Sequence, residues 1–136
     1  VLWLYQGTGK TNAPLTARTR VGGGWNTYTE LVGGADLTGD GTPDLLARDK
    51  TGVLWLYQGT GKTNAPLTAR TRVGGGWNTY TELVSAGDLN SDGSNDLLAT
   101  DAGGALWFYN GTPDAGVPFA ARTQVGKGWT IYNALA

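Results

Sequence analysis

The chain has 136 residues, of which ten are Lys or Arg and eleven are Asp or Glu, and its formal net charge is −1 at pH 7. Only 15% of the residues are charged and no basic run occurs, so neither nucleic acid nor an anionic membrane is an expected partner. Cysteine and histidine are absent, which excludes disulfides, thiolate nucleophiles, the usual zinc ligands and histidine acid–base pairs. We therefore expect a protein that is not an enzyme.

An internal repeat organises the whole sequence. Residues 1–32 recur without a single change as residues 53–84, and a diverged third copy begins at Ala105. Self-similarity at a fixed period indicates an architecture of stacked structural units. Perfect identity beside ordinary drift in the segments between indicates recent duplication or deliberate engineering. Because the chain begins with Val1 rather than Met, inside an expected strand, we also expect that a longer parent was cleaved or truncated.

The segments within one period are short and favour strands over helices. The run at residues 1–5, repeated at 53–57, is apolar and aromatic and ends at Gln-Gly, which is typical of a buried strand. Glycine-rich breaks separate it from the later extended segments. These later segments are 69–73, 77–84 and 96–100. About four strands in each period, at a repeat length near 40–50 residues, is typical of a β-propeller blade.

The prediction is therefore an all-β fold made of four-stranded antiparallel blades. Because a closed propeller needs typically four to eight blades, the chain would supply about two and a half blades of a larger or oligomeric propeller. Its partners would then be other blades, from the same type of chain or from a longer parent. Apolar side chains on the outer faces of the terminal blades would be exposed without these neighbours.

The aromatic residues fall into two groups with different expected roles. Pairs at positions i and i+2 share one face of a strand and favour packing between neighbouring blades. These pairs are Trp3 with Tyr5, Trp55 with Tyr57, and Trp107 with Tyr109. A second group, Trp25, Trp77 and Trp129, follows the glycine breaks and provides the candidates for a sugar-stacking surface.

Two nine-residue segments carry the chemistry of the chain. Segments 36–44 and 88–96 place oxygen-bearing side chains at positions 1, 3, 5, 7 and 9, with a glycine at position 6 for a sharp turn. With a backbone carbonyl at position 7, such a loop would surround a hard cation that takes six to eight oxygen ligands. We predict two Ca²⁺ sites, the first formed by Asp36, Thr38, Asp40, Thr42 and Asp44, and the second by Asp88, Asn90, Asp92, Ser94 and Asp96.

Other interpretations of these segments are weaker. An EF-hand requires a bidentate Glu at position 12, where this chain has Ala47 and Ala99, and it requires flanking helices. Magnesium prefers a rigid octahedral site over a flexible loop with many oxygens. Solvated Asp- and Gly-rich turns would not need the same frame twice, each time followed by Leu-Leu-Ala. Since the Asn90 carbonyl is a better donor than the Thr38 hydroxyl, the second site should bind more tightly.

The frame Asp-x-x-x-Asp-Gly-x-x-Asp-Leu-Leu resembles the FG-GAP/VCBS repeats of integrin α-subunit propellers, which have relatives among secreted bacterial proteins and fungal lectins. This resemblance implies that each calcium loop joins the first two strands of a blade. It divides the chain into a half blade at 1–31 with the last two strands, a blade at 32–83 and a blade at 84–136. The chain departs from the family pattern at Thr38, where Asp or Asn is usual, and it lacks the Gly-Ala-Pro tail of integrin repeats.

Three hypotheses for function follow. The first is a secreted, calcium-stabilised, lectin-like or adhesion-like module that binds a carbohydrate or a protein outside the cell. The second is a structural or engineered repeat that self-assembles into a complete propeller and recognises no ligand. The third is an appendage of a larger secreted hydrolase.

Overall fold

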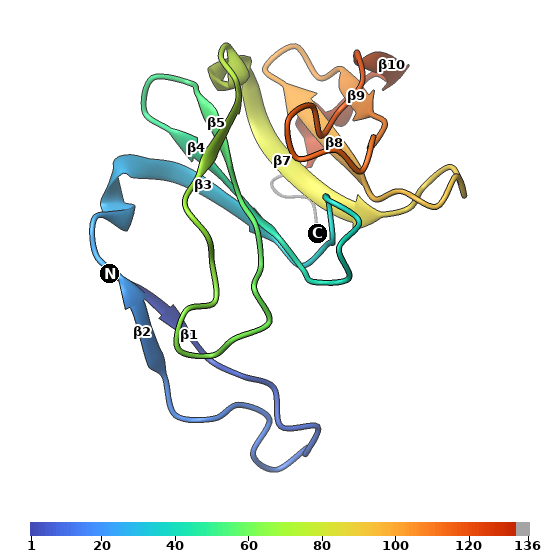
Figure 1. Cartoon of the computed structure of the whole chain (residues 1–136). Coiled ribbons are helices and arrows are strands. Elements are labelled where there is room, and N and C mark those ends of the chain that lie inside the picture. Colours follow the sequence, from blue (N-terminus) through green and yellow to red (C-terminus); the bar gives the residue numbers. More distant parts are fainter. Residues whose placement is uncertain (133–136) are drawn as a thin grey trace.

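Short strands and glycine-rich turns build three antiparallel sheets in this computed structural model, which describes residues 1–132 (Figure 1). The first sheet is a hairpin of two strands, β1 (Leu2–Leu4) and β2 (Thr19–Gly22). It extends away from the other two sheets at the N-terminal end (Figure 1). No helix within the described residues is long and apolar enough to cross a membrane.

The second and third sheets each have four strands that follow one another in chain order. The second sheet consists of β3 (Tyr28–Gly33), β4 (Leu45–Asp49), β5 (Leu54–Tyr57) and β6 (Thr71–Gly74). The third consists of β7 (Tyr80–Gly87), β8 (Asp96–Asp101), β9 (Leu106–Tyr109) and β10 (Thr123–Gly126). Four consecutive antiparallel strands form a propeller blade, so the predicted all-β blade fold is confirmed.

One turn of 3₁₀ helix precedes each of the two four-stranded sheets, and a third turn stands near the end of the described residues. The three turns are η1 (Trp25–Thr27), η2 (Trp77–Thr79) and η3 (Trp129–Ile131). A glycine in the left-handed region comes directly before each turn, as at Gly76 with a φ of 77°. Because most other residues are strained at this φ, the glycine-rich breaks of the sequence are required at these positions.

The positions of the blade boundaries differ from those drawn from the sequence. The division into 1–31, 32–83 and 84–136 puts one blade boundary inside β3 and the other inside β7. Both of these strands pair entirely within their own blades. The first strand begins at Tyr28 or Tyr80, directly after the 3₁₀ turn, because that turn reverses the chain before the tyrosine. Residues 133–136 of the last predicted blade lie outside the described residues.

The core lies between and within the two complete blades. Leu46, Leu54, Leu56 and Leu97 are fully buried, and Leu83 of β7 is 4% exposed. The first strands of the two blades, β3 and β7, are in contact, and the sheets lie side by side (Figure 1). Burying this apolar surface is the main favourable contribution to the folded state.

A single arginine joins the two blades through polar contacts. Arg48 of β4 forms a salt bridge of 2.8 Å with Glu30 of β3. Its Nη1 donates to the carbonyls of Trp77 at 3.0 Å and Tyr80 at 2.6 Å, at the start of the next blade. The other oxygen of Glu30 accepts from the backbone N–H of Leu83 at 2.9 Å. Burial raises the pKa of Glu30, and this backbone N–H and the Arg48 guanidinium act against that rise.

Candidate metal centres

The two predicted calcium loops occupy equivalent places in the two complete blades. The first joins β3 to β4, and the second joins β7 to β8, so each connects the first two strands of its blade. The loops also touch each other, since the Asn95 side chain donates to the carbonyl of Asp36 at 2.8 Å. Loop placement therefore agrees with what the family resemblance implied.

The first aspartate of each loop organises the backbone around itself. One oxygen of Asp36 accepts from Gly39 N–H at 2.7 Å, and the other accepts from Gly41 N–H at 2.7 Å. Asp88 has the same role, accepting from Asp92 N–H at 3.1 Å and Gly93 N–H at 2.9 Å. Desolvation acts to raise the pKa of Asp36, but the backbone N–H groups together outweigh it and lower this pKa. Both loops are thus wound tightly around a carboxylate.

The ninth position of each loop holds a buried carboxylate. Asp44 is 3% exposed and Asp96 is fully buried. The Asp44 side chain accepts from the backbone N–H of Leu37 at 2.8 Å and of Gly59 at 2.9 Å. Asp96 likewise accepts from Leu89 and Gly111. Such bonds compensate the cost of burying the carboxylates and fasten each loop to the hairpin that follows.

The glycines whose backbone N–H groups donate to these carboxylates were not identified in the sequence analysis. A Cβ atom on Gly59 would lie 2.1 Å from the carbonyl oxygen of Pro43, and one on Gly111 would lie 2.0 Å from that of Asn95. Only glycine lets the hairpin backbone approach the loop this closely. The signal in the sequence was the Gln-Gly or Asn-Gly pair that ends each aromatic strand, which we interpreted only as the end of a strand.

The middle of each loop is exposed and formed by local contacts. Asp40 accepts from the backbone N–H of Thr42 at 2.8 Å, and Asp92 accepts from that of Ser94 at 2.9 Å. The Ser94 bond is the main cause that lowers the pKa of Asp92. Asn90 donates to Asn110 at 2.9 Å, an interaction between side chains that ties the second loop to the end of β9.

The donors fit a hard cation in their chemistry, although the carboxylates do not converge. Across residues 1–132, no group of three or more acidic side chains is arranged to hold a metal ion. The aspartates turn toward backbone N–H groups instead. Thr38, at the third position of the first loop, has a buried hydroxyl oxygen for which the described residues provide no hydrogen-bond partner. An oxygen left without a partner at a predicted ligand position is an observation that favours an additional ligand.

The three tryptophans proposed for sugar stacking each begin a 3₁₀ turn, η1, η2 or η3. Trp77 is only 7% exposed and packs against Tyr80, Tyr109 and Phe119, so the expectation of an open stacking surface needs correction there. Trp25 and Trp129 are half-buried, each beside a tyrosine. The indoles pack against tyrosines because the turns before β3 and β7 fold them back onto their own blades.

The middle of the chain matches a known protein family. Residues 36–99 match the family described as FG-GAP-like repeat, which confirms the resemblance noted in the sequence. This part of the chain is therefore similar to an FG-GAP-like repeat. The matched segment runs from the first loop to β8 and contains both loops, and its residues 53–84 recur unchanged as residues 1–32. Neither the curated proteins nor the solved structures compared with the chain gave a match.

Proposed function

We propose that this FG-GAP-like repeat chain is a calcium-binding, non-catalytic module that binds a carbohydrate or a protein outside the cell. The observation that carries the proposal is the duplicated loop. Two blades place oxygen donors at the same five loop positions between their first and second strands, around an aspartate held by backbone N–H groups. Their repetition at equivalent positions supports a shared ligand.

Each loop would hold Ca²⁺ through its carboxylates and neutral oxygens. In the first loop these are the side chains of Asp36, Thr38, Asp40 and Asp44 with the backbone at Thr42. In the second they are Asp88, Asn90, Asp92 and Asp96 with the backbone at Ser94. Calcium would supply a positive charge to a segment that carries three aspartates and stands in an extended loop. Extracellular calcium concentrations suit weak repeated sites, which supports a secreted location.

Thermal unfolding in calcium and in chelator tests the metal. An ion that binds only the folded state adds RT ln(1 + [L]/Kd), about 2.7 kcal/mol at a hundredfold excess over Kd. We expect a higher melting temperature in calcium, little effect of magnesium, and a smaller response in Asp36→Asn. Asp114→Asn, which removes the same charge outside the loops, should respond like the parent. Identical melting curves in calcium and chelator would disprove the metal sites. Glycan arrays in calcium then test the carbohydrate partner.

A second function, assembly with other blades, is favoured by a specific observation. In the N-terminal hairpin Trp3 is 37% exposed, Tyr5 48% and Leu15 57%, and Leu31 of β3 is 42% exposed. Large apolar side chains that are exposed in this way favour an interface. Light scattering after size exclusion should then give a mass that is a multiple of 14.2 kDa. A stable monomer with a single cooperative transition would contradict the assembly role and leave the calcium sites untouched.

A further inference from the structure

We call the blade formed by β3–β6 the second blade and the blade formed by β7–β10 the third blade. The third blade contains a hollow at the position where the second blade holds an arginine. Thr100 of β8 is the counterpart of Arg48 in β4, because each stands four positions after the last aspartate of its loop and directly before an aspartate, Asp101 or Asp49. The short threonine side chain leaves a cavity of about 300 Å³. This volume lies at the lower end of the roughly 300–1,000 Å³ of small-ligand pockets.

The walls of this cavity repeat the groups that bind the Arg48 guanidinium. In the second blade the guanidinium contacts the Glu30 carboxylate and the backbone carbonyls of Trp77 and Tyr80. The counterparts at an offset of 52 residues are Glu82, Trp129 and Tyr132, and all three line the cavity. The internal copy therefore shows which chemical group this set of residues binds.

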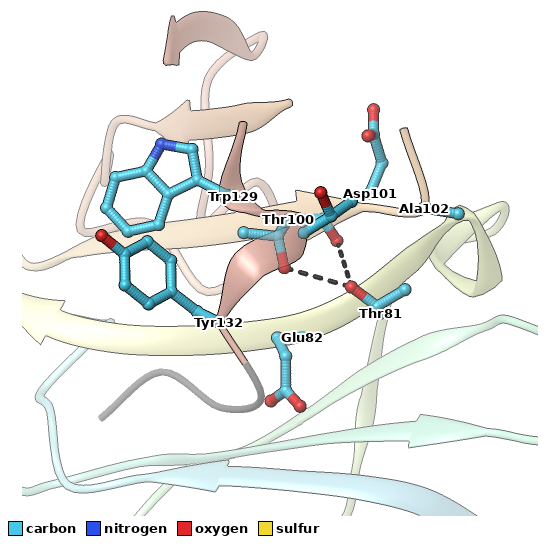
Figure 2. A pocket seen from close by; sticks show the side chains of 8 residues that line it. Thr81, Glu82, Thr100, Asp101, Ala102, Trp129 and Tyr132 are labelled. Atoms are coloured by element: carbon cyan, nitrogen blue, oxygen red, sulfur yellow. Dashed lines mark hydrogen bonds between the residues drawn. The ribbon is translucent and has the colours of Figure 1, made fainter. Parts of the chain in front are cut away.

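Figure 2 shows how these residues lie. The rings of Trp129 and Tyr132 stand next to each other, with centroids 5.1 Å apart, and Glu82 and Thr81 lie across from them. Thr81 donates to the carbonyl of Thr100 at 3.1 Å, and the two threonine hydroxyls are also 3.1 Å apart. Asp101 is already engaged, since it accepts from the indole N–H of Trp107 at 2.9 Å. Among residues 1–132, no Lys or Arg side chain forms a salt bridge with Glu82.

We propose that this hollow is a binding site for a guanidinium group, supplied by free arginine or by an arginine side chain of a partner protein. Glu82 would pair with the cation, and the carbonyls of Trp129 and Tyr132 would accept from its N–H groups, as their counterparts do with Arg48. A planar guanidinium suits this set of acceptors better than an ammonium because it donates in several fixed directions. The site involves no residue of the calcium loops, so the proposal stands independently of them.

Calorimetric titration of the full chain with L-arginine tests the site. We expect one saturable site per chain, weaker binding of L-lysine, and no binding of L-citrulline, which keeps the planar shape but carries no charge. An arginine-containing tripeptide with blocked ends should bind as well if the partner is a protein side chain, and free arginine alone should bind if it is a small molecule. Equal binding of arginine and citrulline would overturn the proposal.

Substitutions of residues that line the hollow test whether arginine binds there. Glu82→Gln should weaken arginine binding by about 10- to 100-fold, because a charge-assisted hydrogen bond is lost. Asp114→Asn removes the same charge elsewhere and should leave the affinity unchanged. Thr100→Arg places in the third blade the residue that the second blade has, so it should fill the site and abolish binding while raising the melting temperature. Undiminished arginine binding in both Glu82→Gln and Thr100→Arg would refute the site.

Discussion

Residues 1–32 and residues 53–84 have the same sequence, but the structure gives them different environments. Leu54 and Leu56 are fully buried, whereas their copies Leu2 and Leu4 are only half-buried. Leu83 is 4% exposed, and its copy Leu31 is 42% exposed. Because the side chains are identical, the neighbouring strands decide the burial. β5 lies between β4 and β6, while β1 pairs only with β2.

This comparison shows that the same residues are buried within a four-stranded blade and remain partly exposed in a two-stranded hairpin. A two-stranded hairpin is at best marginally stable in water, and additional strands or packing against another element stabilise it. In the described residues β1 and β2 form a sheet of two strands, so the aromatic and leucine side chains of the first copy have fewer neighbours. Substitutions at paired positions should consequently have unequal effects.

The largest difference is expected at the central leucines. Leu56→Ala should lower the free energy of unfolding by about 2–5 kcal/mol, because it leaves a cavity in a fully buried position. Leu4→Ala, the same change in the same sequence, should cost roughly 1 kcal/mol because less apolar surface is lost. Urea denaturation of both variants measures the two values. Equal losses would show that the first copy is packed as fully as the second, for instance in an assembly.

The glycines after the aromatic strands, Gly7 and Gly59, are a second pair of identical residues in different environments. Gly59→Ala should destabilise the chain by roughly 1–3 kcal/mol, because its Cβ would meet the carbonyl oxygen of Pro43. Gly7→Ala should be close to neutral, since a Cβ at Gly7 meets nothing within 4 Å. The two melting temperatures give the comparison. A destabilising Gly7→Ala would indicate that the first hairpin also receives a loop, from strands supplied by another chain.

The repeat made the architecture predictable from sequence, because one period contains four extended segments and the loops lie between them. The exact blade boundary was not predictable, since Tyr28 follows Trp25 in a sequence that is compatible with one continuous strand. The left-handed Gly24 and the 3₁₀ turn at Trp25–Thr27 place the start of β3 at Tyr28. The family match to residues 36–99 supports the same architecture.

The candidate loops were predictable for a similar reason, since their residues are contiguous and need no tertiary information. The contacts that fasten the loops were not. Asp44 reaches Gly59 across fifteen residues, and Arg48 reaches Tyr80 in the next blade. Pairings of this kind depend on how the blades pack, and the aspartates and arginine alone do not specify their partners. Calcium binding itself stays a prediction.

The two loops can also be compared, since they occupy equivalent places in the two blades but differ in sequence. We expect the second site to bind calcium roughly tenfold more tightly, a difference of about 1.4 kcal/mol, since the Asn90 carbonyl donates better than the Thr38 hydroxyl. Calorimetry on Asp40→Ala isolates the second site, and Asp92→Ala isolates the first. The ranking is wrong if the site that remains in the Asp92 variant is the tighter one.

The backbone conformation of the second loop is less favourable than that of the first, although its ligand set favours calcium binding. Ser91 has a φ of 61°, in the left-handed region, where the first loop has Gly39 with a φ of 77°. Ser91→Gly should therefore stabilise the chain by about 1 kcal/mol in the absence of calcium, because a residue with a Cβ atom is disfavoured there. Thermal unfolding in chelator measures the effect. Ser91→Ala is the control, since it keeps the Cβ atom and should bring no such gain.

The smallest effect concerns alkaline pH and the paired tyrosines. Burial, together with the 2.6 Å hydrogen bond between the Tyr57 and Tyr28 hydroxyls, raises the pKa of Tyr57 to about 12. A pKa raised in the folded state contributes stability that is fully present below the unfolded value near 10 and is lost as the pH rises through about 12. The copy of Tyr57 is Tyr5, which is 48% exposed. Spectrophotometric titration of tyrosinate should therefore lose one late-titrating group in Tyr57→Phe and keep it in Tyr5→Phe. If both variants keep the same late component, the hydroxyl pair of the second blade does not control the titration.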